Sequence, residues 1–138
     1  MKINKSKEDL QPAVLKIIQE GGSPTEQLVD FGWATIQPSG WYYFLTGILT
    51  TFLTKYVILA LTNERLIIIN TDMLLTPKNY ITFPLSQLRC LKFNTGFTYI
   101  TLSLLFPDNK KEKYQFFKND KSGWNTVAEK IAGVLPKV

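Results

Sequence analysis

A succession of short β-prone segments, separated by turn residues and with no helical segment between them, constrains the fold most. These segments are rich in β-branched and aromatic side chains and cover residues 28–36, 55–62, 66–70, 80–83, 88–93, 98–106 and 113–117. Two turns have hairpin composition: Asn63-Glu64-Arg65, in which asparagine tolerates a positive φ, and Pro107-Asp108-Asn109-Lys110. Strands that follow one another without crossover helices pair antiparallel. The sequence therefore predicts a mainly β chain that folds as a barrel or a sandwich.

Two amphipathic segments flank the predicted strands. Residues 6–20 form the first, with Ser6 as its cap and a glycine pair at its end. Residues 122–135 form the second, capped by Asp120 or Ser122. The apolar positions of the second segment fall on one face: Trp124, Val127, Ala128, Ile131, Ala132 and Leu135. A face this broad must be buried, and we expect this helix to cover the open mouth of the barrel.

Histidine is absent from the 138 residues, and Cys90 is the only cysteine. The chain therefore has no histidine base for a catalytic triad, no His/Cys zinc site and no internal disulfide. We predict no catalytic residue, no metal site and no cofactor. We expect Cys90 to be a small buried residue and Arg65 to pair with a carboxylate, both as parts of the structure. The length favours one main domain, which we place at residues 26–138, after a helical extension over residues 1–25.

Positive charge is concentrated in the C-terminal half of the predicted β region. The chain has 16 basic and 11 acidic residues, a net charge of +5, and 14 of the basic residues are lysine. From Lys78 to Lys121 there are eight basic residues and three acidic ones. Lysines attract anionic lipid head groups, whereas base readout favours arginine, so we predict no nucleic-acid binding. Three lysines near one hairpin tip are either a solvated surface or part of a lipid contact: Lys110, Lys111 and Lys113.

Residues 31–54 carry no charge and hold seven of the 18 aromatic residues. Four consecutive aromatic residues within this stretch are a candidate surface for a partner or a bilayer interface: Trp41, Tyr42, Tyr43 and Phe44. The alternative is that these rings cover one end of the core. Residues 41–61 also reach the length of a transmembrane span, but Lys55 and four threonines argue against a spanning helix.

Two segments of the predicted β region carry a family resemblance. Residues 61–69 read Leu-Thr-Asn-Glu-Arg-Leu-Ile-Ile-Ile, and residues 81–88 read Ile-Thr-Phe-Pro-Leu-Ser-Gln-Leu. They resemble a hairpin and a strand of the bacterial pleckstrin-homology-like (PH-like) domains, and the match covers about residues 26–135. The resemblance implies a barrel of about seven antiparallel strands in two roughly orthogonal sheets, capped by the C-terminal helix, and no enzymatic activity. Phosphoinositide-binding relatives carry basic residues around their first hairpin, but this chain has none between Lys16 and Lys55.

These observations favour a binding module over an enzyme. Our leading hypothesis is a non-catalytic PH-like interaction module that binds protein partners or associates with itself, without a small-molecule substrate. The alternative is peripheral membrane binding, with the aromatic residues 41–44 inserted and the lysine-rich surface on anionic lipid. Residues 1–7 have no secretory-signal pattern, and a lone cysteine suits a reducing compartment. We therefore expect a cytoplasmic protein, or one peripheral to the inner face of the membrane.

Overall fold

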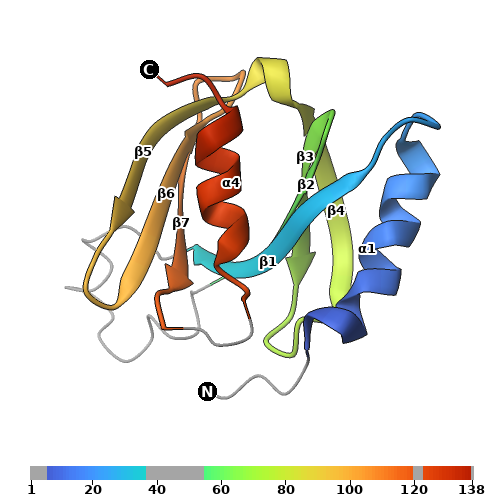
Figure 1. The fold of residues 1–138 in the computed structure, drawn as a ribbon, viewed down its shortest axis with the longest axis horizontal. Helices are drawn as coiled ribbons and strands as arrows, with labels where there is room; N and C mark the ends of the chain where they lie inside the picture. Colours follow the sequence, from blue (N-terminus) through green and yellow to red (C-terminus); the bar gives the residue numbers. More distant parts are fainter. Residues whose placement is uncertain (1–5, 37–54, 120–122, 138) are drawn as a thin grey trace.

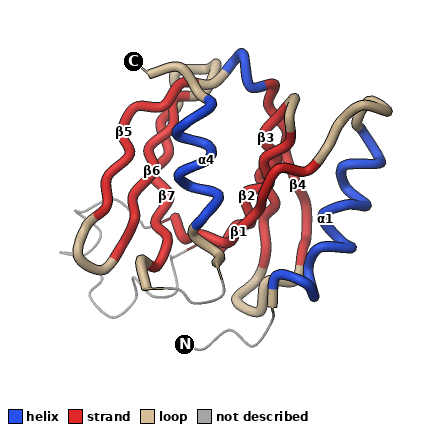
Figure 2. The backbone as a smooth tube through the Cα atoms, viewed as in Figure 1, coloured by secondary structure: helices blue, strands red, loops and turns tan. Residues whose placement is uncertain are grey.

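Hydrogen bonds join seven antiparallel strands into one continuous sheet in the order β4-β3-β2-β1-β7-β6-β5 (Figures 1 and 2). The computed structural model describes residues 6–36, 55–119 and 123–137. The strands are β1 (Leu28–Ile36), β2 (Lys55–Thr62), β3 (Arg65–Thr71), β4 (Pro77–Pro84), β5 (Arg89–Thr95), β6 (Tyr99–Leu105) and β7 (Lys111–Phe117). The helices are α1 (Lys7–Gly21), the short 3-10 helix η2 (Leu85–Gln87) and α4 (Thr126–Val134). The mainly β class, the seven antiparallel strands and both flanking helices are confirmed.

Strand β1 divides the sheet into two halves. It pairs with β2 along its whole length, but with β7 only through Thr35 and Ile36 at its C-terminal end. The half formed by β2, β3 and β4 therefore diverges from the half formed by β7, β6 and β5, and α4 lies between them (Figure 1). The two orthogonal sheets that the resemblance implies are thus two halves of one sheet that share β1. Among the described residues no ladder joins β4 to β5.

Helix α4 lies on the concave side of the sheet and buries the apolar face that the sequence predicts. All six predicted positions are buried, and five of them pack in one core with residues from both halves of the sheet. The helix begins at Thr126, later than predicted. The side-chain amide of the preceding Asn125 donates to the carbonyls of Phe117 (2.8 Å) and Lys118 (2.9 Å), which holds this segment against the end of β7. Two predicted caps lie outside the described residues: Asp120 and Ser122.

Helix α1 covers the outer face of the half of the sheet that β2, β3 and β4 form. Ser6 caps it as predicted, through a reciprocal capping box with Asp9. Its buried stripe of Leu10, Val14 and Ile18 packs in a second core with residues of β1, β2 and β3. The separation of a helical extension from the main domain stays a prediction, although the helix packs directly on the sheet.

Asparagine shapes two hairpin turns in different ways. The β2–β3 hairpin forms where predicted, but the expectation of a positive φ at Asn63 is wrong. Its side chain instead accepts a hydrogen bond from the Gln27 N–H (2.8 Å) and donates one to the Thr25 carbonyl (3.2 Å). Asn109, in the β6–β7 turn, takes a positive φ of 67°. Strand β4 begins at Pro77, three residues before the predicted segment 80–83, because Asn70 and Thr71 at the end of β3 pair with Asn79 and Pro77.

Candidate functional site

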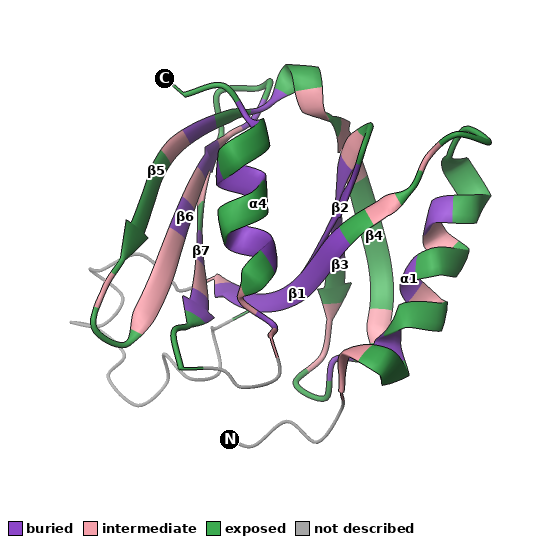
Figure 3. Ribbon diagram, in the orientation of Figure 1, coloured by how far each residue is buried: buried purple, intermediate pink, exposed green. Residues whose placement is uncertain are grey.

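The outer face of β5, β6 and β7 has no helix packed on it in the described part of the chain. Helix α4 lies on the concave side, and α1 lies on the outer face of the opposite half (Figures 1 and 3). In β7, Tyr114 and Phe116 point into the core and are each 1% exposed. Side chains alternate along a strand, so Lys111 and Lys113 point outward from the sheet. Among the described residues, no helix therefore covers this face.

Strand register aligns four cations on this outer face in two rows. In one row, Lys92 of β5 and Lys113 of β7 lie directly opposite Ser103 of β6. In the next row, Arg89 and Lys111 flank β6 in the same way. Directly opposite residues in an antiparallel sheet point to the same face. All four cationic residues are exposed, and we call them the basic rows: Arg89, Lys92, Lys111 and Lys113.

A β-bulge in β5 brings Lys92 to this face. The pairing of β5 with β6 shifts register between Cys90 and Lys92. Cys90 faces the core and is 3% exposed, which confirms its prediction as a buried residue, whereas Lys92 lies opposite Ser103. In a regular strand, residues two apart share a face, and Lys92 would point the same way as Cys90. The bulge therefore completes the first of the basic rows.

Within β5, β6 and β7, the outer face carries no carboxylate beside the basic rows. The row next to them is neutral and consists of Asn94, Thr101 and Gln115. Glu112 is the only acidic residue in β5, β6 and β7, and it alternates with the outward-pointing lysines of β7. Its carboxylate lies 3.6 Å from the ammonium of Lys110. The face therefore presents concentrated positive charge that favours polyanions.

The structure describes three of the seven predicted site residues. Lys111 and Lys113 belong to the basic rows, whereas Lys110 lies in the β6–β7 turn. The aromatic cluster of residues 41–44 lies outside the described residues. Two cations that the charge pattern alone did not single out come from β5: Arg89 and Lys92. Only the register across β6 places these two beside the lysines of β7.

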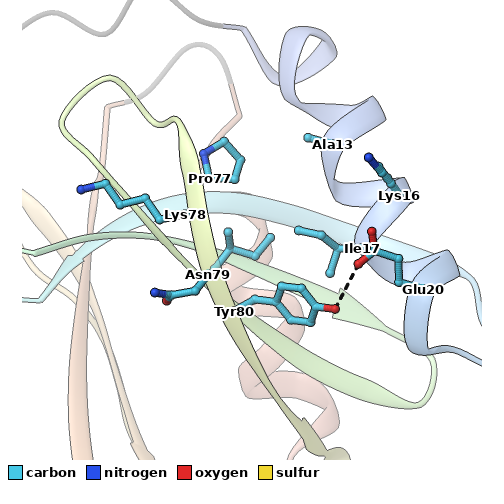
Figure 4. Close-up of a pocket in the computed structure, with 9 residues that line it drawn as sticks. Ala13, Lys16, Ile17, Glu20, Pro77, Lys78, Asn79 and Tyr80 are labelled. Atoms are coloured by element: carbon cyan, nitrogen blue, oxygen red, sulfur yellow. Dashed lines mark hydrogen bonds between the residues drawn. The ribbon is translucent and has the colours of Figure 1, made fainter.

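A groove with a volume of about 270 Å³ runs between α1 and β4 (Figure 4). The Tyr80 hydroxyl of β4 donates to the Glu20 carboxylate of α1 across this groove (3.2 Å), and Ile17 lines the wall beside them. In the described residues, no group of three or more His, Cys, Asp or Glu side chains could hold a metal ion. Glu20 is the only carboxylate among the residues that line the groove, and it is already bonded to Tyr80. The groove is therefore a packing interface between helix α1 and the edge strand β4.

A buried carboxylate ties both long helices to β1. Asp30 is 8% exposed. Its carboxylate accepts hydrogen bonds from the Lys7 ammonium (2.7 Å), the Thr126 hydroxyl and the Phe31 N–H (2.8 Å). The ammonium of Lys130 lies 3.2 Å from the Oδ2 of the same carboxylate. Burial raises the pKa of Asp30, but the hydrogen bonds from Lys7 and Thr126 outweigh burial and hold that pKa below its usual value. Because these partners come from α1 and α4, the cluster holds the fold together.

The Asp30 cluster predicts sensitivity to acid. A carboxyl group whose pKa is lowered by folding contributes stability that is fully present well above its unfolded-state pKa of about 3.9. That contribution is lost as the pH falls through the lower folded-state value. Urea unfolding at pH values from about 7 down to about 2 is expected to show this loss, and Asp30→Asn is expected to flatten it. A wild-type stability that stays constant to the lowest pH would contradict this role of Asp30.

Similarity to one solved domain supports the fold. No protein-family model matches the chain, and no curated protein matches its sequence. The chain is similar to the solved hSac2 domain from the human phosphoinositide phosphatase Sac2, with a TM-score of 0.54 and 14% identity, over 98% of this chain and 90% of that one. It is also similar to the C-terminal domain of an unknown protein from Leishmania infantum, with a TM-score of 0.49 and 10% identity, over 88% of this chain and 97% of that one. At such identity, the hSac2 likeness shows a shared fold alone.

Within residues 6–36, 55–119 and 123–137, no helix has the length and apolar character needed to cross a bilayer. The expectation that residues 41–61 do not form a spanning helix is confirmed for residues 55–61, which belong to β2. Residues 41–54 lie outside those ranges.

Proposed function

We propose that this protein is a non-catalytic interaction module of the PH-like type, akin to the bacterial domains that its β2–β3 hairpin resembles, and that it binds anionic membrane surfaces peripherally. The basic rows carry this proposal, because they align four exposed cations on one face of three strands that carry no carboxylate on that face. The expected location is the cytoplasm or the inner face of the membrane, where anionic lipids gather.

The size of the electrostatic attraction suits reversible binding. Each lysine or arginine near an anionic leaflet contributes about 1 kcal/mol, so the basic rows contribute about 4 kcal/mol. That free energy corresponds to roughly a thousandfold in affinity. A polybasic patch needs a second signal for stable anchoring. The basic rows alone therefore predict weak binding that salt disrupts.

Binding of a protein partner or a second copy, our other hypothesis, draws less support from this face. The cores of protein interfaces are enriched in aromatic residues and depleted of lysine, whereas the basic rows contain three lysines and one arginine. The hypothesis also rests on the uncharged stretch of residues 31–54. Residues 31–36 of this stretch belong to β1, and residues 37–54 lie outside the described residues. An anionic lipid surface is therefore the partner that the geometry favours.

Vesicle co-sedimentation with two charge-matched variants tests this proposal. The wild type is expected to bind phosphatidylcholine vesicles that contain about 30% phosphatidylserine, to bind less as salt rises, and to ignore neutral vesicles. Lys92→Glu/Lys113→Glu is expected to lower the affinity at least about 30-fold, since it reverses two charges of the basic rows. The control Lys16→Glu/Lys78→Glu changes the net charge equally at the α1–β4 groove and is expected to keep most of the affinity.

Three outcomes would contradict membrane binding through the basic rows. Equal losses of vesicle affinity in both double variants would mean that the net charge of the protein alone drives binding. Equal binding of the wild type to neutral and anionic vesicles would remove the role of charge. A dimer that light scattering detects in the wild type but not in Lys92→Glu/Lys113→Glu, without vesicle binding, would favour self-association instead. Phosphoinositide vesicles are a useful second composition, since the similar hSac2 domain comes from a phosphoinositide phosphatase.

A further inference from the structure

The tip of the β5–β6 hairpin presents an aromatic side chain to solvent at one end of the outer face. Phe97 is 95% exposed, and the next most exposed large apolar side chain in the described residues, Leu74, is 64% exposed. Phe97 lies between Thr95, which ends β5, and Tyr99, which begins β6. A lone exposed phenylalanine is ordinary on a protein surface. The support beneath Phe97 and the charges beside it make this one different.

Backbone hydrogen bonds hold the hairpin tip in place. The Gly96 N–H donates to the Tyr99 carbonyl (2.9 Å), and the Lys118 N–H, just after β7, donates to the Thr98 carbonyl (3.0 Å). Behind the tip, the ring centroids of Tyr99 and Phe117 lie 5.3 Å apart. Phe97 therefore projects from a tip that neighbouring strands and rings support. Contact with a partner costs such a preformed tip little conformational entropy.

One cation lies beside the hairpin tip, and the basic rows lie behind it on the outer face. Lys118 is exposed, and its backbone is bonded to the tip. The row of Lys92 and Lys113 crosses β6 at Ser103, six residues from Phe97, which is about 20 Å at ~3.4 Å per residue. An amphipathic protein surface enters a bilayer by roughly 5–10 Å, to the boundary of head groups and acyl chains. A tilted sheet with an inserted tip thus brings the row close to the lipid phosphates.

We infer that Phe97 is a membrane anchor, which enters the boundary of head groups and acyl chains while the basic rows contact lipid phosphates. The inference rests on the membrane binding proposed above and names the second, apolar signal that the basic rows require. Withdrawing a phenyl side chain from water strengthens binding by roughly 10- to 100-fold. A bilayer is the occupant that fits, because the tip is a protrusion bordered by lysine, and lipid phosphates complement that charge.

Matched serine variants separate the anchor from the charges. Phe97→Ser is expected to weaken binding to phosphatidylserine-containing vesicles by roughly 10- to 100-fold with an unchanged dependence on salt. Leu74→Ser removes an exposed apolar side chain from the β3–β4 turn and is expected to bind as the wild type does. Phe97→Trp is expected to bind as tightly as the wild type does, since tryptophan favours the membrane interface. Circular dichroism and thermal unfolding test whether each variant is folded.

A fluorophore at position 97 reports insertion directly. Phe97→Cys and the control Leu74→Cys can each be labelled with an environment-sensitive dye, because the native Cys90 is buried. Lipids that carry a spin label near the glycerol are expected to quench the dye at position 97 and not at position 74.

Each other outcome identifies which inference fails. Unquenched dye at position 97, or wild-type affinity of Phe97→Ser, would overturn the anchor. The membrane proposal would survive that result if the basic-row variant still lost binding. Vesicle binding that depends on neither Phe97 nor the basic rows would overturn both. A dimer that Phe97→Ser disrupts, with vesicle binding unchanged, would assign the tip to a second copy of the chain and overturn the anchor.

Discussion

The Gly32→Ala variant is expected to lose about 3 kcal/mol of unfolding free energy. Gly32 lies in the buried part of β1, opposite Leu59 of β2. A Cβ atom at this position would overlap the carbonyl oxygen of Trp124, and it would lie 2.8 Å from the carbonyl carbon of that residue and 3.1 Å from Cγ1 of Val127. The obstructing atoms include backbone, which cannot turn aside as a side chain does. The strand and the start of α4 would therefore have to move apart.

Gly133→Ala is the matched control for this variant. Gly133 is exposed in α4, and apart from its chain neighbours and the backbone of its own helix, a Cβ atom there meets no atom within 4 Å. Because alanine is a better helix former, this variant is expected to gain about 0.5 kcal/mol. Denaturant unfolding measures both shifts. A wild-type midpoint for Gly32→Ala would contradict the close approach of β1 to the residues that precede α4.

The Arg65→Ala variant is expected to lose about 3 kcal/mol at neutral pH, because it leaves a buried carboxylate without its cation. The Nε of Arg65 donates to Glu26 (2.8 Å), and its Nη2 donates to the Ile18 carbonyl (3.1 Å). The side chain of Glu26 is completely buried, and that of Arg65 is 13% exposed. This pair confirms the prediction that Arg65 binds a carboxylate. It also joins the start of β3 to the end of α1 and to the segment before β1.

The loss in Arg65→Ala is expected to depend on pH. Burial raises the pKa of Glu26, but the hydrogen bonds from Arg65 and Thr62 and the charge of Arg65 hold it below its usual value. The ion pair therefore contributes fully above an unfolded-state pKa of about 4.3, and the cost of Arg65→Ala shrinks as acid protonates Glu26.

Lys110→Ala is the control for the buried ion pair, since it removes an exposed cation 3.6 Å from Glu112. Surface pairs of this kind contribute little, so the variant is expected to change stability by less than about 0.5 kcal/mol. Urea unfolding at neutral and acidic pH compares the two variants. Equal effects at neutral pH, or a cost of Arg65→Ala that does not change with pH, would contradict the role given to Glu26.

Features of the fold that depend on local pattern could be predicted from the sequence. The alternation of Ile100, Leu102 and Leu104 with polar residues marks the inner face of β6, and Leu102 and Leu104 are completely buried. Features that depend on distant partners could not be predicted. Asn63 is an example, because its side chain bonds to Gln27 and Thr25, 36 and 38 residues earlier in the chain, and its φ is not positive. Neither partner is visible in a window of neighbouring residues.

The candidate site also combines residues that stand out in the sequence with residues that only the tertiary structure brings beside them. Lys111 and Lys113 stand out in the sequence because they are close to each other near a turn. Arg89 and Lys92 join them only through the register of β6 and the bulge in β5, and a strict alternation would place Lys92 on the core side. The exposure of Phe97 could not be predicted, because nothing in its sequence neighbourhood distinguishes it from buried phenylalanines such as Phe106 and Phe116.

The ladder between β1 and β7 governs when the chain can finish folding. Thr35 pairs with Gln115 and Ile36 with Tyr114, so the earliest strand to leave a ribosome obtains one of its two neighbours only after the last strand has followed. At about 5–20 residues per second this interval lasts several seconds, whereas a hairpin such as β2–β3 forms in about 1–10 μs. High contact order delays the final step further. Throughout that interval the nascent chain exposes an unpaired strand edge and the apolar surface on which α4 later packs. In this state, aggregation or chaperone capture competes with folding.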